Sequence, residues 1–153
     1  SEKFLEITVP VTTKEQIKEI KKTVTHIAKK HDEEPYKALA TTQQAIFHQL
    51  EEQDEIDAAA IFDKVFEEKP LARQAAQLAI TEERVPEKIA VTNVPKYERK
   101  YSKQKFKLDN GIEITIPSEI YENKEMVEFI NNPDGSVSVL IKNIESILNK
   151  FNA

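Results

Sequence analysis

The two glycines of this chain constrain its fold most tightly, because both stand in turn signals between runs of alternating apolar and polar residues. Gly111 ends the turn signal at 109–111, and Gly135 ends the one at 132–135. On either side of each signal, apolar side chains recur at every second position, which is typical of strands with one buried face. Residues 103–141 therefore predict two β-hairpins in series.

The register of the first hairpin depends on the length of its loop. A two-residue Asn-Gly turn would place Leu108 opposite the charged Glu113. A three-residue loop, with the glycine in the left-handed conformation, instead pairs Leu108 with Ile112. It also pairs Phe106 with Ile114, so apolar side chains meet on one face. We therefore expect the three-residue loop.

The second hairpin is expected to have a three-residue loop as well, since proline suits the second position of a type I turn and glycine the fourth. This loop pairs Val127 with Ile141 and Phe129 with Val139. Between the hairpins, residues 118–122 predict a capped helical turn. After them, helical spacing of apolar residues predicts a short C-terminal helix containing Ile144, Ile147, Leu148 and Phe151.

Residues 1–84 contain no glycine and show a helical period. Thr12 with Glu15, or Thr13 with Gln16, makes a capping box at the first helix, and Asp57 is a cap for the third. We expect four helices, over about 13–30, 35–53, 58–67 and 71–83. The fourth is expected to bury Leu71, Ala75, Leu78 and Ala79.

These elements predict an α+β fold. An N-terminal helical lobe of about four helices (1–84), which begins with an extended lead-in over 1–11, is followed by a connector (85–102) that can add an edge strand. Residues 103–153 are expected to form a four-stranded antiparallel β-meander, made of the two hairpins and closed by the short C-terminal helix.

Composition excludes several classes of protein. The 153 residues suit one domain or two small lobes, and the formal net charge of −5 argues against strong non-specific binding of polyanions. There is no cysteine and no apolar run of the ~18 residues that a membrane span needs. We expect a cytoplasmic protein with no membrane partner and, because the chain begins at Ser1, a piece of a longer protein.

The sequence shows no pattern typical of catalysis or metal binding. His26, His31 and His48 lack ligand spacing, and His31 suits the end of a helix. The acidic runs 32–34 and 51–55 lack the glycine of a calcium loop and suit solvated helix caps. With both glycines in hairpins, a phosphate loop is excluded as well. We expect no cofactor, no metal and no enzymatic activity.

One segment has the character of a binding surface, namely KYERKYSKQKFK at 96–107. Its single acid is Glu98, and tyrosine and phenylalanine stand between its basic residues, a combination that suits phosphate contact. The alternative is a solvated strand face whose lysines discourage edge aggregation. The candidate DNA-binding residues are Lys96, Arg99, Lys100, Lys103, Lys105 and Lys107.

The order of elements resembles the C-terminal half of the bacterial NdpA-like nucleoid-associated proteins over roughly residues 8–150. In that family an acidic DEI segment precedes a short helix, a strand carries a G-[IL]-[ET]-I pattern, and a second hairpin ends in I-K-[GN]. The matching residues here are Asp54, Glu55, Ile56, Gly111, Ile112, Ile114, Ile141 and Lys142.

The resemblance implies association with the bacterial nucleoid and a separate N-terminal half as a partner. It brings no catalytic residues. Two functions stay open. One is a non-enzymatic domain that contacts the phosphate backbone of DNA, and the other is a protein-interaction or homo-oligomerisation domain with no DNA contact of its own.

Overall fold

The computed structural model describes residues 12–152 and divides into two compact units, with the boundary between Tyr101 and Ser102. The extended lead-in predicted for 1–11 lies outside the described residues. No helix in the described part is long and apolar enough to cross a membrane.

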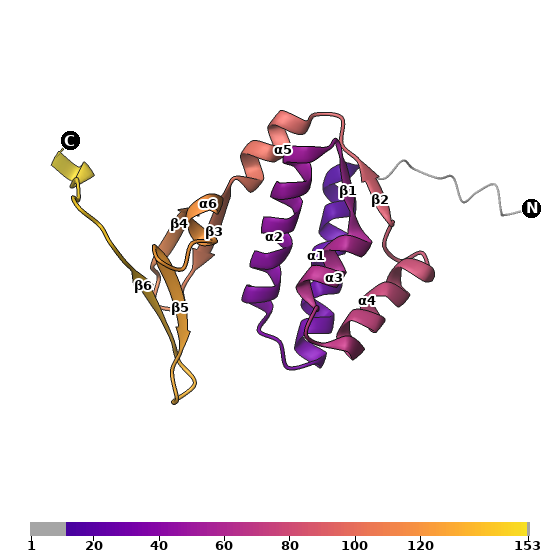
Figure 1. Ribbon diagram of the computed structural model, residues 1–153, viewed down its shortest axis with the longest axis horizontal. Helices are drawn as coiled ribbons and strands as arrows, with labels where there is room; N and C mark the ends of the chain where they lie inside the picture. Colours follow the sequence, from indigo (N-terminus) through magenta and orange to yellow (C-terminus); the bar gives the residue numbers. More distant parts are fainter. Residues whose placement is uncertain (1–11, 153) are drawn as a thin grey trace, which may run out of the picture. The chain divides into compact units, whose positions relative to one another are not determined.

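The first unit is built on two long helices that lie side by side, α1 (Thr13–Lys30) and α2 (Pro35–Glu52) (Figure 1). Thr12 and Glu15 form the capping box of α1, since the Thr12 hydroxyl accepts from the Glu15 N–H at 3.1 Å and the Glu15 carboxylate accepts from the Thr12 N–H at 3.1 Å. Pro35 begins α2, where its missing N–H costs nothing. Both helices were predicted, and both are confirmed.

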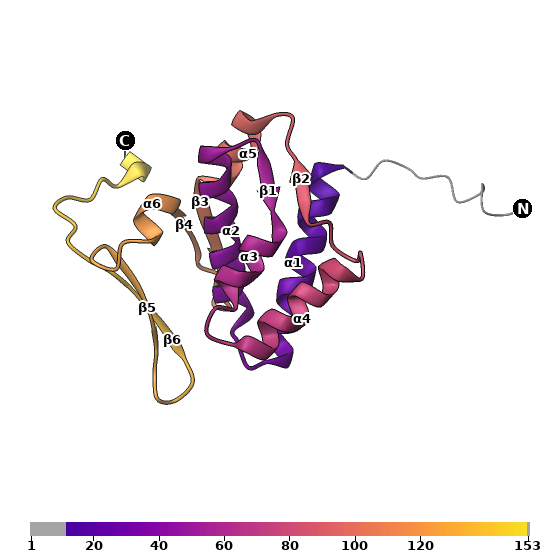
Figure 2. The same cartoon turned by 45° about the vertical axis from the view of Figure 1, so that its right-hand side comes forward.

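Helices α3 (Ala58–Val65) and α4 (Pro70–Thr81) pack against this pair (Figures 1 and 2). Strands β1 (Glu55–Asp57) and β2 (Lys88–Ala90) form an antiparallel ribbon beside them. Asp57 caps α3 as predicted, by accepting from the Ala60 N–H at 3.2 Å. The core lies between these elements and includes the fully buried side chains of Ile20, Val24, Ile46, Ile56, Ile61, Phe62 and Ile89.

Helix α4 turns a different face to the core than its leucines predicted. Leu71 is 70% exposed and Leu78 is 49% exposed, whereas Ala72 and Ala76 are fully buried. Of the four predicted core positions, Ala79 is fully buried and Ala75 packs against the core from a partly buried position. Alanines at this contact let α4 approach α1 and α3 closely, which a row of leucines would prevent.

The segment expected to connect the helices to the hairpins, residues 85–102, contains β2 and a further helix, α5 (Val94–Tyr101). Pro95 stands in the first turn of α5, a position that tolerates proline. Helix α5 packs against α2 and contributes Tyr101, which is 1% exposed, to the core of the first unit.

The second unit contains the two predicted hairpins with the predicted registers. Strand β3 (Lys103–Lys107) pairs with β4 (Glu113–Pro117), and Phe106 lies opposite Ile114. Strand β5 (Val127–Asn131) pairs with β6 (Val137–Ile141). Gly111 and Gly135 have φ of +95° and +90°, the left-handed region that their loops require.

Helix α6 (Ser118–Tyr121) joins the two hairpins and holds them together through three rings. The ring centroid of Phe106 lies 5.8 Å from that of Tyr121 and 5.0 Å from that of Phe129. The Tyr121 and Phe129 centroids are 5.8 Å apart. One aromatic residue from β3, one from α6 and one from β5 therefore form the centre of this unit.

Two parts of the α+β prediction are wrong. The hairpins stay separate two-stranded sheets, so β4 and β5 do not pair into a four-stranded meander. The C-terminal helix is absent, since residues 142–149 have no regular structure and a single 3-10 turn spans Lys150–Asn152. Ile147 is 84% exposed and Phe151 is 95% exposed. A short helix needs an apolar surface to pack on, and these side chains have none within the described residues.

Candidate functional site

The structure places the six predicted basic residues on two different elements of two different units. Lys96, Arg99 and Lys100 lie on α5 of the first unit, and the other three lie on β3 of the second. All six are exposed. The segment therefore supplies three basic residues to each of the two units.

On β3 the alternation of the strand separates the charged side chains from the apolar ones. Lys103, Lys105 and Lys107 are exposed, while Gln104 is 2% exposed and Phe106 packs in the ring cluster. The three lysines thus share the face of the hairpin that points away from the aromatic residues. This is the arrangement that the two-residue period predicted.

On α5 the two tyrosines face the core and the basic side chains face outward. The Lys96 Nζ lies 5.6 Å from the centroid of the Tyr97 ring, and the Lys100 Nζ lies 6.0 Å from that of Tyr101. Each ammonium group is therefore within the range in which the face of an aromatic ring attracts a cation.

A third lysine, from helix α1, also approaches the Tyr101 ring. The Nζ of Lys21 on α1 lies 4.7 Å from the centroid of the Tyr101 ring. Lys21 and Lys100 are 79 positions apart in the sequence, and both approach one tyrosine. We call Lys21, Lys96, Arg99 and Lys100 the α1–α5 basic surface.

The environment of Lys21 disfavours its charge. Burial, and to a smaller extent the nearby Lys100 ammonium, lower the pKa of its ammonium group to about 8. Burial also raises the pKa of Tyr101, with a smaller contribution from Tyr97, so the phenol stays neutral at physiological pH. The tyrosine therefore offers the two ammonium groups a ring face and no counter-charge.

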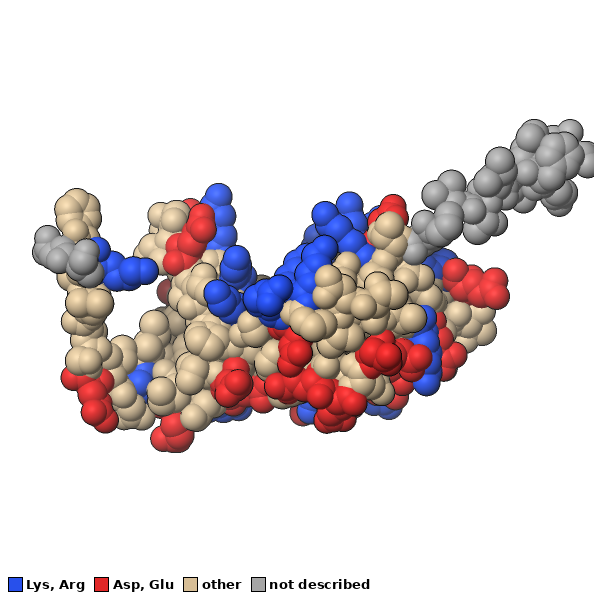
Figure 3. Space-filling view, turned by 90° about the horizontal axis from the view of Figure 1, so that it is seen from above, with Lys and Arg blue, Asp and Glu red and all other residues tan. Residues whose placement is uncertain are grey.

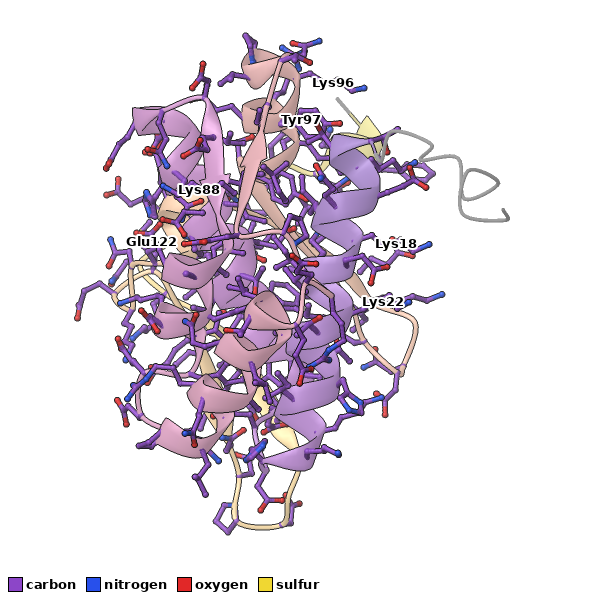
Figure 4. The ribbon with its side chains drawn as sticks, turned by 90° about the vertical axis from the view of Figure 1, so that its right-hand side faces the viewer. Lys18, Lys22, Lys88, Lys96, Tyr97 and Glu122 are labelled. Atoms are coloured by element: carbon purple, nitrogen blue, oxygen red, sulfur yellow. The ribbon has the colours of Figure 1, made fainter. Side chains whose placement is uncertain are left out.

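No carboxylate in the described part of the chain forms an ion pair with Lys21, Lys96 or Lys100, whereas the neighbouring Lys22 pairs with Glu19 at 3.7 Å. Figure 3 shows that on the first unit Lys and Arg side chains gather mostly along one side and Asp and Glu along the other. Figure 4 shows Lys18 and Lys22 pointing outward from the same side of α1. The net negative charge of the chain is thus distributed unevenly over its surface.

Lys21 was missed by the sequence analysis, although a signal for it exists. Lys14, Lys18 and Lys21 stand at i, i+4 and i+7, which places them on one face of α1. That stripe predicts a basic helix face. The meeting of this face with α5 is set by tertiary packing.

The arrangement suits the binding of phosphate groups. Ammonium groups without carboxylate partners are free to bind an anion, and the adjacent rings add apolar contact for sugar or base edges. In the described residues, no group of three or more His, Asp or Glu side chains is arranged to hold a metal ion. A hollow of the first unit lies along α3 and α4, is lined by Asp63, Leu71, Arg73 and Gln77, and has no such concentration of basic side chains.

The chain was compared with known proteins. A family model described as Nucleoid-associated protein YejK matches residues 1–149. This match confirms the resemblance to nucleoid-associated proteins that the order of elements indicated. No curated protein and no solved structure matches the chain.

Proposed function

This chain belongs to the nucleoid-associated protein YejK family, and on that premise we propose that its α1–α5 basic surface contacts the phosphate backbone of DNA without any enzymatic step. The observation that supports this most is the meeting of Lys21 and Lys100 over the Tyr101 ring, with no carboxylate in the described residues to neutralise either of them. The nucleoid is then its location and DNA its partner.

The charges of this protein suit contact with the phosphate backbone of DNA better than recognition of base edges. The chain has a net charge of −5, so attraction to DNA depends on the local basic surface and weakens quickly as salt screens it. Helix α5 has only eight residues and buries its tyrosine side, so it does not suit the role of a recognition helix that enters the major groove. The expected binding is weak and independent of sequence.

The lysines of β3 are a second candidate contact. Lys103, Lys105 and Lys107 form an exposed row on one face of the hairpin. Because they belong to the second unit, their contribution is separable from that of α5 by mutation.

Fluorescence anisotropy with a labelled DNA duplex at low salt tests the proposal. We expect Lys96→Gln with Lys100→Gln to weaken binding roughly tenfold, because two phosphate contacts are lost. The matched control is Lys64→Gln with Lys124→Gln, which removes the same charge from exposed positions off α1 and α5. Equal weakening in both double variants would show that only net charge matters, and would reject the assigned surface.

A second candidate function is binding of another protein chain, and the second unit supports it. Of the described residues 102–151, only Ile116 and Val127 are buried large hydrophobic residues. In contrast, several large apolar side chains are 45% or more exposed in this unit, and these are Ile112, Leu140, Ile141, Ile144, Ile147, Leu148 and Phe151. A surface of this kind is typical of an interface.

Light scattering at several concentrations tests this second function. A chain that stays strictly monomeric at every concentration, and that also fails to bind the N-terminal half that the family resemblance implies, would reject it. Association that is lost in Leu148→Ser with Phe151→Ser, and kept in the Lys96 and Lys100 double variant, would assign it to the second unit.

A further inference from the structure

We propose that Lys21 is a modification site, at which the side-chain amine attacks small anionic acyl phosphates and becomes an Nζ-acyl-lysine. The inference rests on the proposed function only for its consequence, which is regulation of DNA contact. The modification itself follows from the surroundings of Lys21.

The position of the Lys21 amine is unusual among the lysines of α1. Its Nζ is held 4.7 Å from the Tyr101 ring centroid, and its side chain is only partly exposed. Lys18, three residues before Lys21, and Lys22, the residue directly after it, are exposed and point outward (Figure 4). A small reagent can therefore reach Lys21, but water solvates its charge less well than that of its neighbours.

Three effects act on the charge of this amine. The face of the Tyr101 ring favours the ammonium form, while partial burial and the Lys100 ammonium disfavour it. Burial is the largest effect, and the pKa of Lys21 falls to about 8. A lysine desolvated beside another cation is a recognised way to obtain a nucleophilic amine.

The lowered pKa gives Lys21 a larger fraction of neutral amine than an ordinary lysine has. Near pH 7.5, a pKa of about 8 instead of 10.5 raises the fraction of neutral amine on the order of a hundredfold. A less basic nucleophile is intrinsically weaker, which offsets part of that gain. The net expectation is roughly tenfold faster acylation of Lys21 than of an exposed lysine.

The choice of an anionic donor follows from the neighbouring charges. Lys100 approaches the same Tyr101 ring and forms no ion pair with a carboxylate in the described part of the chain. Its ammonium group can hold the phosphate of an acyl phosphate next to the Lys21 amine. Lys96 adds to the positive potential of this surface.

The reaction balances without a further reagent. The lone pair of the Lys21 Nζ attacks the acyl carbon, an amide C–N bond forms and the C–O bond to phosphate breaks. Inorganic phosphate leaves with the bonding pair, and the amine proton passes to that phosphate or to water. No oxidant or reductant is involved.

Acylation would change the α1–α5 basic surface in two ways. It removes the charge of Lys21 and its attraction to the Tyr101 ring. If this surface contacts DNA, the acylated chain should bind a duplex several-fold more weakly, as Lys21→Gln should.

The test is incubation of the full chain with acetyl phosphate near pH 7.5, followed by peptide mapping by mass spectrometry. We expect the initial acetylation rate of Lys21 to exceed the rates of Lys18 and Lys22 roughly tenfold, since all three share one helix and one reagent. Lys100→Gln should slow Lys21 several-fold, and the matched control Lys64→Gln, at an exposed position on α3, should not. Circular dichroism checks that each variant is folded.

A neutral reagent, an acetyl N-hydroxysuccinimide ester, separates nucleophilicity from capture of the phosphate. Lys21 should still react faster than Lys18 and Lys22 with this ester, and Lys100→Gln should slow it less than it slows the reaction with acetyl phosphate. Acetylation of Lys21 no faster than that of Lys18 and Lys22 with acetyl phosphate overturns the inference. Rapid acetylation without any DNA binding by the unmodified chain would reject the proposed function and leave the modification site standing.

Discussion

At the scale of single residues, Lys21 illustrates how position outweighs residue type. Lys18, Lys21 and Lys22 belong to one helix, yet only Lys21 lies against an aromatic ring and beside another unneutralised lysine. Lys22 instead has Glu19 as a partner in solvent. The same side chain is therefore a surface charge at one position and a perturbed amine at the next.

The perturbed amine predicts a dependence of stability on pH. The pKa of Lys21 is about 8 in the folded chain against 10.5 when unfolded, so the unfolded chain binds more protons between these values and stability rises with pH there. The raised pKa of Tyr101 acts in the opposite sense above about pH 10, where an unfolded phenol ionises. We expect urea midpoints to rise from pH 8 to 10 and this rise to vanish in Lys21→Met. A wild-type midpoint that falls over this interval would contradict the environment assigned to Lys21.

At the scale of elements, the start of α1 depends on a reciprocal cap. The Thr12 hydroxyl and the Glu15 carboxylate each satisfy a backbone N–H that the helix leaves without an internal partner. We expect Thr12→Ala to destabilise the chain by about 1 kcal/mol in urea unfolding. Thr23→Ala, a change of the same type within α1, should cost less, because alanine is the better helix former there. Equal losses in the two variants would argue against the capping box.

Elements whose structure is determined by residues close together in the chain were predictable from the sequence. The registers of both hairpins followed from the glycine of each loop and from the alternation of apolar residues, since a slip by one residue would turn Phe106 and Ile114 to the wrong face. Helix α5 was not predicted, because Pro95 suggested an edge strand. The helical spacing of Val94, Tyr97 and Tyr101 was present but short.

Elements whose structure depends on a neighbour were not predictable. The apolar residues at 144–151 have helical spacing, but a helix so short forms only against a surface that buries it. In α4, the residues that meet α1 and α3 are alanines and not leucines, because distance between helices decides which side chains fit. The spacing of apolar residues predicts which residues share one face of a helix. The packing of the neighbouring helices determines which face is buried.

At the scale of the whole molecule, the candidate site was only partly visible in the sequence. Lys96, Arg99 and Lys100 were found because they are close together along the chain. Lys21 was not, since it approaches Lys100 only in the folded chain, where Lys21 of α1 lies over the ring of Tyr101 at the end of α5. The division into two units also assigns Lys100 and Lys103, which the sequence had grouped, to different units.

The exposure of the C-terminal residues predicts that they do not stabilise the isolated chain. Leu148 is 75% exposed and Phe151 is 95% exposed. Leu148→Ser with Phe151→Ser should therefore change the free energy of unfolding by no more than about 0.5 kcal/mol in the monomer. A loss of several kcal/mol would mean that these side chains are buried in solution, either within the chain or against another copy.

The salt dependence of DNA affinity tests the central claim most directly, because it counts phosphate contacts. Anisotropy titrations of a duplex at several salt concentrations give the slope of log affinity against log salt for the wild type and for Lys96→Gln with Lys100→Gln. If both lysines contact phosphates, the slope of the variant should be shallower by about 1.8, whereas Lys64→Gln with Lys124→Gln should leave it unchanged. Identical slopes for the wild type and the α5 variant would contradict the claim that this surface binds the DNA backbone.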